Sequence, residues 1–421
     1  MESYTSTYLP LRRDLFDKFI VILLFGILPI DMLNGIMLKA GITLPLSISQ
    51  VFKFTIIIFL FIRMSLFPKF EFLLLIFVFI LLCIPSVIQQ FSFNYREFFL
   101  VDDLIKTSKY ITPFLSLIFF KSVFENNSTK GLLKLIYYWI FFSYVLFAVN
   151  ILLKYVGLGF PMYEYANTGT KGFFYSGNEI SALLLVLYSF IAYHFWEIKK
   201  NKLWFFLFFI FNLIVAITIT SKTAMIGIVL ITLMIPLRMK EFVYVSFNKI
   251  ISIFIIIFFI IPVAVYLAYR LLADSLIMER LTYFYNKLDP VTFIFSGRNL
   301  KAKEMIEIYK KDYNILQELM GGGQTYYESQ LGSVIEIDFL DLFFAYGIMG
   351  ALIFIFIIFL LSFQSLSRTF NNNYQYAKLS VIMLFILTFT SSIAGHVYNS
   401  GIAGFYIGFV LSLMYLKRET L

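Results

Sequence analysis

The chain has 421 residues, of which 60% are hydrophobic and 14% are charged, and its formal net charge is +9. A soluble protein carries about 25% charged residues, so this composition excludes an ordinary soluble protein, although the length would allow two or three soluble domains. Backbone polar groups in lipid must pair within their own element, which leaves helices or closed barrels. Barrel strands alternate over roughly ten residues, whereas the apolar runs here are continuous. The sequence therefore predicts an all-α, polytopic integral membrane protein.

Apolar runs of spanning length follow one another from the N-terminus to the C-terminus. Each is near the roughly 20 residues that cross a hydrocarbon core of about 30 Å. Together they predict a single transmembrane domain, 1–421, with about twelve helices. The predicted helices lie at 17–36, 46–67, 70–89, 104–124, 132–155, 177–197, 203–220, 222–238, 250–269, 338–363, 378–395 and 399–416.

Loop charges set the orientation of these helices. Cytoplasmic loops carry an excess of Lys and Arg. With the N-terminus inside, every inner turn is basic and the short outer loops hold few cations, so both termini are predicted to be cytoplasmic. The inner cations are Arg12, Arg13, Lys18, Arg63, Lys69, Lys121, Lys130, Lys134, Lys199, Lys200, Lys202, Arg238, Lys240, Lys249, Arg368, Lys417 and Arg418; the main outer ones are Lys39, Arg96, Lys154 and Lys171.

One outer loop is long, at about 270–337. Loops of this length without a domain of their own are usually functional, and a plain extracytoplasmic cap is the alternative. Its middle, RNLKAKEMIEIYKKDYNILQEL, has the spacing of an amphipathic helix that could lie at the membrane surface. The run Gly321-Gly322-Gly323 ends this helix and predicts a hinge or a close backbone approach.

Cysteine and histidine are scarce. Cys83 is the only cysteine and lies in an apolar run, which excludes an intrachain disulfide and a cysteine metal cluster. The histidines, His194 and His396, are too few for a histidine metal site. We therefore expect neither a metal nor another cofactor. The first apolar run lacks an A-x-A-like cleavage site and is predicted to remain as a signal anchor.

Basic groups mark two places on the predicted outer side. Lys222 opens a helix in TITSKTAMIG, where free N–H groups and the helix dipole favour an anion; the alternative is a lysine that snorkels to the interface. Arg298 follows Ser296-Gly297, and Arg280 lies upstream in MERLTYFY. Arginine matches phosphate with two parallel hydrogen bonds, although surface arginines are also common.

Carboxylates and a histidine mark two further places on the predicted outer side. EIDFLDLFFAYGIMG brings Glu336, Asp338 and Asp341 to the outer end of a predicted helix. Acidic residues suit a helix N-terminus, but three carboxylates are more than capping of one helix requires. Charged groups at membrane depth are costly and usually functional. His396 lies on the same side in GHVYNSG, with a structural role as the alternative.

Cations beside carboxylates at one face suit transfer from an anionic, lipid-linked donor. A diphosphate is a good leaving group once arginine and lysine neutralise its charge, and the acceptor hydroxyl needs one general base. A P-loop, HExxH and a nucleophile elbow are absent from the sequence. We expect Lys222, Arg280 and Arg298 to hold the diphosphate and Glu336, or alternatively Asp338, to take the proton. His396 would bind phosphate or sugar, and Tyr326 and Tyr327 would stack on sugar rings.

The order of these motifs over roughly 165–410 resembles the O-antigen ligase and O-antigen polymerase superfamily of the Wzy and WaaL type. The matching features are GFFYSGNEISALL, TSKTAMIG, the SGR of the long loop, and EIDFLDLFFAYGIMG. Lys222 stands where the family often has arginine, and Arg298 matches the arginine of the large loop. Glu336 stands where ligases tend to carry histidine, eleven residues before Gly347. That departure favours a polymerase over a lipid A-core ligase.

The resemblance implies a GT-C-like architecture and an inverting, metal-independent glycosyltransferase. It implies donor and acceptor glycans on undecaprenyl diphosphate, for O-antigen or capsular polysaccharide, at the outer face of the bacterial inner membrane. An O-antigen or teichoic-type ligase is the alternative enzyme. A flippase for lipid-linked oligosaccharides is the rival from another class, supported by Lys53, Lys106 and Lys109 within or near spans, although transporters place such groups at the midplane of two related halves. The sequence leaves open whether a chain-length regulator binds, and we expect no nucleic-acid partner.

Overall fold

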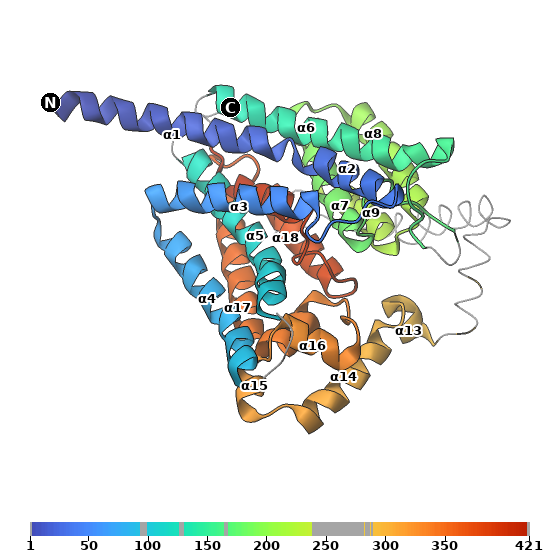
Figure 1. Ribbon diagram of the computed structural model, residues 1–421. Coiled ribbons are helices and arrows are strands. Elements are labelled where there is room, and N and C mark those ends of the chain that lie inside the picture. The colour runs from blue at the N-terminus through green and yellow to red at the C-terminus, as the bar shows by residue number, and fades with distance from the viewer. Residues whose placement is uncertain are drawn as a thin grey trace.

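The computed structural model describes residues 2–92, 99–125, 130–163, 167–237, 282, 287 and 289–418. This part of the chain is helical (Figure 1), with three isolated β-bridges and no longer strand among its residues. The predicted all-α class is confirmed for these residues.

The helices of the N-terminal part follow the predicted apolar runs. The first predicted span is divided into two helices at Phe25-Gly26. The elements are α1 (Glu2–Leu24), α2 (Ile27–Lys39), α3 (Ile48–Leu66), α4 (Phe70–Ser92), α5 (Phe99–Glu125), α6 (Lys130–Leu152), the 3-10 turn η1 (Leu153–Val156), α7 (Asn178–Tyr193), the π-helical turn η2 (His194–Ile198), α8 (Lys202–Ile219) and α9 (Lys222–Met234).

The C-terminal part begins with short helices and ends with long apolar ones. The elements are α13 (Pro290–Phe295), α14 (Arg298–Asp312), α15 (Ile315–Met320), α16 (Gln324–Leu331), α17 (Asp338–Thr369), α18 (Ala377–Ser391), α19 (Gly404–Ser412) and the 3-10 turn η5 (Leu413–Tyr415).

Several of these helices can cross a membrane. Seven stretches in the described part are long and apolar enough, and three shorter apolar helices coincide with the predicted spans 222–238, 378–395 and 399–416. The chain is thus a multi-pass membrane protein, while the number twelve and the orientation stay predictions. The predicted span 250–269 lies outside the described residues. The seven stretches are Arg13–Lys39, Ile48–Leu66, Phe70–Gln89, Lys130–Val156, Glu179–Ile198, Lys202–Ile219 and Asp338–Thr369.

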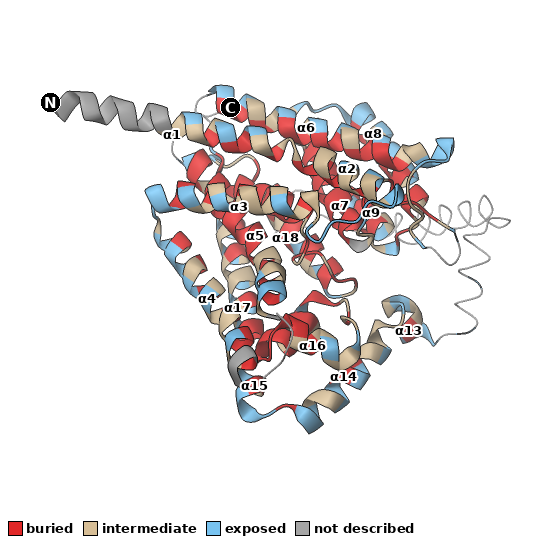
Figure 2. Ribbon diagram, viewed as in Figure 1, coloured by how far each residue is buried: buried red, intermediate tan, exposed pale blue. Residues whose placement is uncertain are grey.

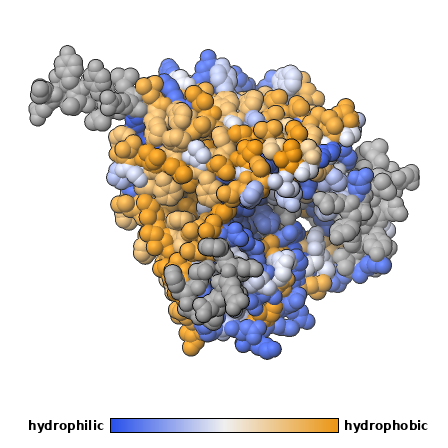
Figure 3. Space-filling model, in the orientation of Figure 1, coloured by the Kyte–Doolittle hydropathy of each residue, from blue (hydrophilic) through white to orange (hydrophobic). Residues whose placement is uncertain are grey.

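The helices enclose a core formed by α7 and α19. Every residue of α19 is buried, and α19 packs against α5, α7 and α18. Figure 2 shows the buried residues on the facing sides of the helices. In Figure 3, apolar side chains cover α1, α3 and α4, whereas hydrophilic ones gather where α13, α14 and α16 lie. An apolar belt and a polar end are what a membrane protein with an external loop requires.

The predicted amphipathic helix is two helices, which corrects that expectation. Asn314 adopts an extended conformation and caps α15, because its side-chain oxygen accepts a hydrogen bond from the Gln317 N–H at 3.0 Å. The following α16 is held by Asp103 of α5, whose carboxylate accepts from the Thr325 N–H and hydroxyl, each at 2.5 Å. α15 packs against α4 and α17, and α16 packs against α4, α5 and α17.

A kink in α17 receives the glycine run of the loop. Gly347 has φ 67° and ψ −168° within the helix, a conformation open almost only to glycine. The Gly323 N–H donates to the Ala345 carbonyl at 2.9 Å, and a Cβ on Gly347 would lie 2.5 Å from the backbone of Leu319. The predicted close backbone approach of the glycine run is thus confirmed, against this kink.

We expect Gly347→Ala to destabilise the protein by at least about 1–3 kcal/mol, the cost of such backbone strain, because a methyl group would also meet the Leu319 backbone. Thermal unfolding of the purified chain in nanodiscs measures the loss. Gly332→Ala is the matched control, since Gly332 has φ 69° but nothing within 4 Å of its ideal Cβ. Equal losses in the two variants would show that the close approach contributes nothing.

Candidate functional site

The N-terminus of α9 is fixed by hydroxyl groups. Ser221 is the N-cap, and its Oγ accepts from the Ala224 N–H at 3.3 Å and lies 2.7 Å from the Ser181 Oγ of α7. Lys222 follows at the first helical position. Its Nζ donates to the Phe293 carbonyl at 3.0 Å and lies 4.0 Å from the centre of that ring. The predicted basic turn is thus tied to α7 and to α13.

Arg298 opens α14 after two residues in the left-handed conformation. Ser296 has φ 54° and Gly297 has φ 85°, which turns the chain sharply between α13 and α14. One guanidinium nitrogen donates to Glu336 Oε2 at 2.7 Å, and another lies 3.4 Å from the Phe295 carbonyl. The Nε–H has no hydrogen-bond partner among the described residues. Arginine donors of this kind suit a phosphate oxygen.

Glu336 lies two residues before α17 in a strained conformation, with φ 68°. Its carbonyl accepts from the Gly395 N–H at 2.5 Å. A Cβ on Gly395 would collide with the Glu336 backbone, so only glycine permits this approach. The side chain of Glu336 keeps 33% exposure. Strain held by surrounding structure is typical of functional positions.

Lys222, Arg298 and Glu336 line one cavity of about 310 Å³. The sequence predicted that these three residues converge, and the structure brings them together. Two cations face one carboxylate, so the lining has a positive balance that favours an anion. The remaining lining residues come mainly from α7, α9 and the segment after α18: Met162, Tyr163, Ser181, Ala182, Leu185, Ser221, Thr223, Ser296, Thr390, Ala394, Gly395 and Val397.

Asp338 has a different environment from Glu336. It is 1% exposed, and its carboxylate accepts from the N–H groups of His396 at 2.6 Å, Val397 at 3.0 Å and Tyr398 at 2.8 Å. It does not line the cavity. The alternative assignment of Asp338 as the base is therefore corrected: its oxygens already hold the turn between α18 and α19.

We expect Asp338→Asn to lower the stability of the fold, because an amide offers one acceptor oxygen where a carboxylate offers two. A hydrogen bond to a charged group contributes about 1.5–3 kcal/mol, so the loss should be of that order. Thermal unfolding measures it, with Asp312→Asn at the exposed end of α14 as the control. An unchanged unfolding temperature for Asp338→Asn would contradict the structural role.

His396 lies between two lining residues without lining the cavity itself. Its φ is 63°, its N–H is held by Asp338, and the residue is half-buried. Its role in binding phosphate or sugar stays a prediction. Arg280 lies outside the described residues, so its predicted contact with the diphosphate also stays a prediction.

Tyr327 is enclosed, which corrects its predicted role in stacking on a sugar. It is 0% exposed, its hydroxyl donates to Asp341 Oδ1 at 2.5 Å, and it accepts from the Ile335 N–H at 2.8 Å. Burial beside the Asp341 carboxylate raises the pKa of Tyr327 above its usual range and keeps the phenol a donor. Tyr326 is half-buried against Tyr313, and its role stays a prediction.

Ser181, Ser221 and Gly395 line the cavity and were not predicted as site residues, although each lies within a motif described above. They carry no charge, and charge was the basis on which most site residues were predicted. The one usable signal was the small residue at the start of GHVYNSG, because a glycine beside a polar turn is typical of a close backbone approach.

Residues 284–419 match a family described as O-antigen ligase like membrane proteins. The match covers 136 of the 421 residues and includes Arg298, Glu336 and Gly395, whereas Lys222 lies outside it. No curated protein matches the chain. The similarity supports the resemblance to the O-antigen ligase and polymerase superfamily over these residues. It does not distinguish a polymerase from a ligase.

Proposed function

We propose that this protein is a glycosyltransferase that polymerises undecaprenyl-diphosphate-linked oligosaccharide repeat units at the outer face of the bacterial inner membrane. One observation carries the proposal: Lys222 and Arg298, 76 residues apart in the chain, line one cavity with Glu336. The family match to residues 284–419 supports the same class of enzyme.

The cations bind the donor diphosphate. In the structure, Arg298 forms an ion pair with Glu336 at 2.7 Å, and Lys222 donates a hydrogen bond to a backbone carbonyl. A diphosphate oxygen is a stronger acceptor than a carbonyl and competes with the carboxylate for the guanidinium. Arrival of the donor therefore weakens the Arg298–Glu336 ion pair and makes the carboxylate available for the acceptor hydroxyl. Binding of one substrate thus prepares the base for the other.

The reaction is a single displacement at the anomeric carbon of the donor glycan. The acceptor hydroxyl oxygen forms the new bond to this carbon on the face opposite the diphosphate, which inverts the configuration. The bond from carbon to diphosphate oxygen breaks, and undecaprenyl diphosphate leaves with the electron pair. Glu336 takes the hydroxyl proton, while Lys222 and Arg298 stabilise the charge that develops on the leaving group.

Lengthening of lipid-linked repeats tests the proposal directly. The full chain, purified into lipid nanodiscs, is incubated with lipid-linked single repeats in the presence of a chelator, and the products are separated by size. We expect a ladder of longer chains. Products of unchanged length would contradict polymerisation, and lengthening that requires an added divalent cation would contradict the metal-independent step.

A ligase is the second candidate, because the matched family carries that description. A ligase would use the same diphosphate cavity and transfer a finished glycan to a different acceptor. The glycans of a strain lacking this gene distinguish the two: single repeats indicate a missing polymerase, whereas full-length chains that remain unattached to their final acceptor indicate a missing ligase.

A further inference from the structure

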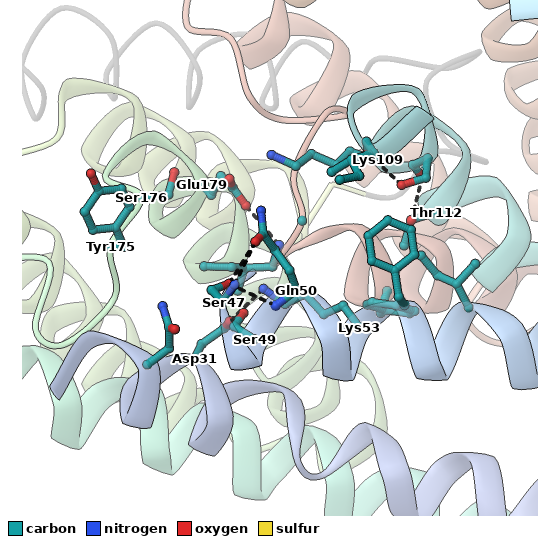
Figure 4. A pocket seen from close by; sticks show the side chains of 18 residues that line it. Asp31, Ser47, Ser49, Gln50, Lys53, Lys109, Thr112, Tyr175, Ser176 and Glu179 are labelled. Atoms are coloured by element: carbon teal, nitrogen blue, oxygen red, sulfur yellow. Dashed lines mark hydrogen bonds and ion pairs between the residues drawn. The ribbon is translucent and has the colours of Figure 1, made fainter. Parts of the chain in front are cut away.

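A second cavity, of about 170 Å³, lies between α2, α3, α5, α7 and the start of α19 (Figure 4). Its charged lining residues are Asp31, Lys53, Lys109 and Glu179. Hydroxyl and amide side chains line most of the remaining polar surface. The function proposed above uses none of these residues.

The charges of this cavity balance, in contrast to the first. Asp31 Oδ1 accepts from Lys53 Nζ at 2.7 Å and from the Ser49 hydroxyl. Glu179 Oε2 accepts from the Ser400 hydroxyl at 2.8 Å and from the Ile402 N–H at 2.9 Å. Two ammonium groups thus face two carboxylates, so the lining has no net attraction for an anion or for a cation.

Two polar groups of this lining have no hydrogen-bond partner among the described residues. Asp31 is 6% exposed, and its Oδ2 atom has no hydrogen-bond partner among the described residues. Within the same part of the chain, no hydrogen bond or ion pair engages the ammonium of Lys109, which acts on the Glu179 carboxylate through electrostatic attraction. Figure 4 shows the Lys109 side chain extending toward Glu179. A buried acceptor left unpaired costs free energy, and a ligand that donates to it removes that cost.

These groups select a hydroxyl-rich, uncharged ligand. A phosphate would place its charge beside the Asp31 carboxylate, and a metal ion would meet two ammonium groups. A sugar, by contrast, carries several hydroxyl groups, which can donate to the Asp31 carboxylate and accept from the Lys109 ammonium. Tyr175, 69% exposed, also lines the cavity and offers an aromatic face for a sugar ring. By a comparable measure a water needs roughly 10–15 Å³, so the space suits about a dozen heavy atoms, the size of one sugar ring.

We propose that this second cavity binds an uncharged sugar residue of the lipid-linked glycan. That the sugar belongs to this glycan rests on the proposed function, whereas the chemical class of the ligand, an uncharged sugar, rests on the cavity alone. The two cavities flank one segment, because Gly395 and Val397 line the first while Gly401 and Ile402 line the second. The sugar belongs either to the acceptor repeat or to the donor chain.

The test compares two probes on the full chain in nanodiscs: inorganic pyrophosphate, and the phosphate-free oligosaccharide released from lipid-linked repeats. Saturation-transfer NMR detects the weak binding expected between the protein and a free oligosaccharide. We expect Lys109→Gln to weaken oligosaccharide binding about tenfold and to change pyrophosphate binding by less than about twofold. Arg298→Gln should do the reverse. Lys154→Gln, at an exposed lysine of η1, is the control for loss of charge.

Oligosaccharide binding that Lys109→Gln leaves unchanged would overturn the proposal, as would a loss of pyrophosphate binding in that variant. Tyr175→Ala is a second variant that should weaken oligosaccharide binding, and its exposed side chain can be removed without loss of the fold. If pyrophosphate binds no form of the protein while the sugar still depends on Lys109, the diphosphate chemistry fails and the sugar site stands. In the transfer assay, a raised KM for acceptor or for donor in Lys109→Gln identifies the source of the sugar, and an unchanged KM for both contradicts the site.

Discussion

Replacement of Arg298 by glutamine is expected to lower the rate of glycan transfer by about 10²–10³-fold, the usual effect of removing one donor from a developing negative charge. The guanidinium lines the cavity and donates to Glu336 at 2.7 Å, so its loss removes a diphosphate ligand and leaves the base without its positioning partner. Initial rates with lipid-linked repeats measure the effect. Arg298→Lys should retain part of the rate, because lysine keeps the charge and loses the planar fork.

Lys303→Gln is the matched control for this prediction. Lys303 lies on the same helix, α14, is exposed, and changes charge by the same amount. If the rate of Arg298→Gln equals that of Lys303→Gln, the phosphate role of Arg298 is refuted. Unfolding temperatures of both variants show whether a lost rate reflects a lost fold.

Replacement of Glu336 by glutamine should lower kcat by about 10²–10⁴-fold, the usual contribution of a positioned base. The glutamine amide oxygen can still accept from Arg298 and the backbone is unaltered, so KM for the acceptor should change little. Loss of kcat at constant KM is the mark of an interaction made in the transition state. Rates over a range of acceptor concentrations separate the two quantities.

Glu304→Gln, at an exposed position on α14, controls for the loss of one negative charge. Full activity in Glu336→Gln would refute the proposed role of this carboxylate as the general base. A drop in activity that follows the unfolding temperature would instead assign the Glu336 carboxylate a structural role, through its ion pair with Arg298.

The positions of the helices were predictable because lipid leaves the backbone few options. An apolar run of spanning length must pair its polar groups internally, so run lengths located most of the helices directly. The kink of α17 was not predictable in this way. Gly347 takes its conformation from a contact with Leu319 and the glycine run, and hydropathy carries no information about such contacts.

The candidate site was predictable in its location and less so in its detail. The inside–outside pattern of charges placed Lys222, Arg298 and Glu336 on one side, and they meet in one cavity. The choice between Glu336 and Asp338 depends on hydrogen bonds from residues about 60 positions later. The burial of Tyr327 likewise depends on Asp341 and Phe344. No local pattern encodes these contacts.

The docking of the glycine run against the kink of α17 constrains how this protein can vary in length. The chain from Gly323 to Glu336 is held at both ends, at Ala345 and at Gly395. An insertion or deletion between these anchors would shift the Glu336 carboxylate relative to the guanidinium. The exposed turn at Gly157 and Leu158 lies outside this anchored stretch, so an epitope tag there leaves the chain length between the two anchors unchanged.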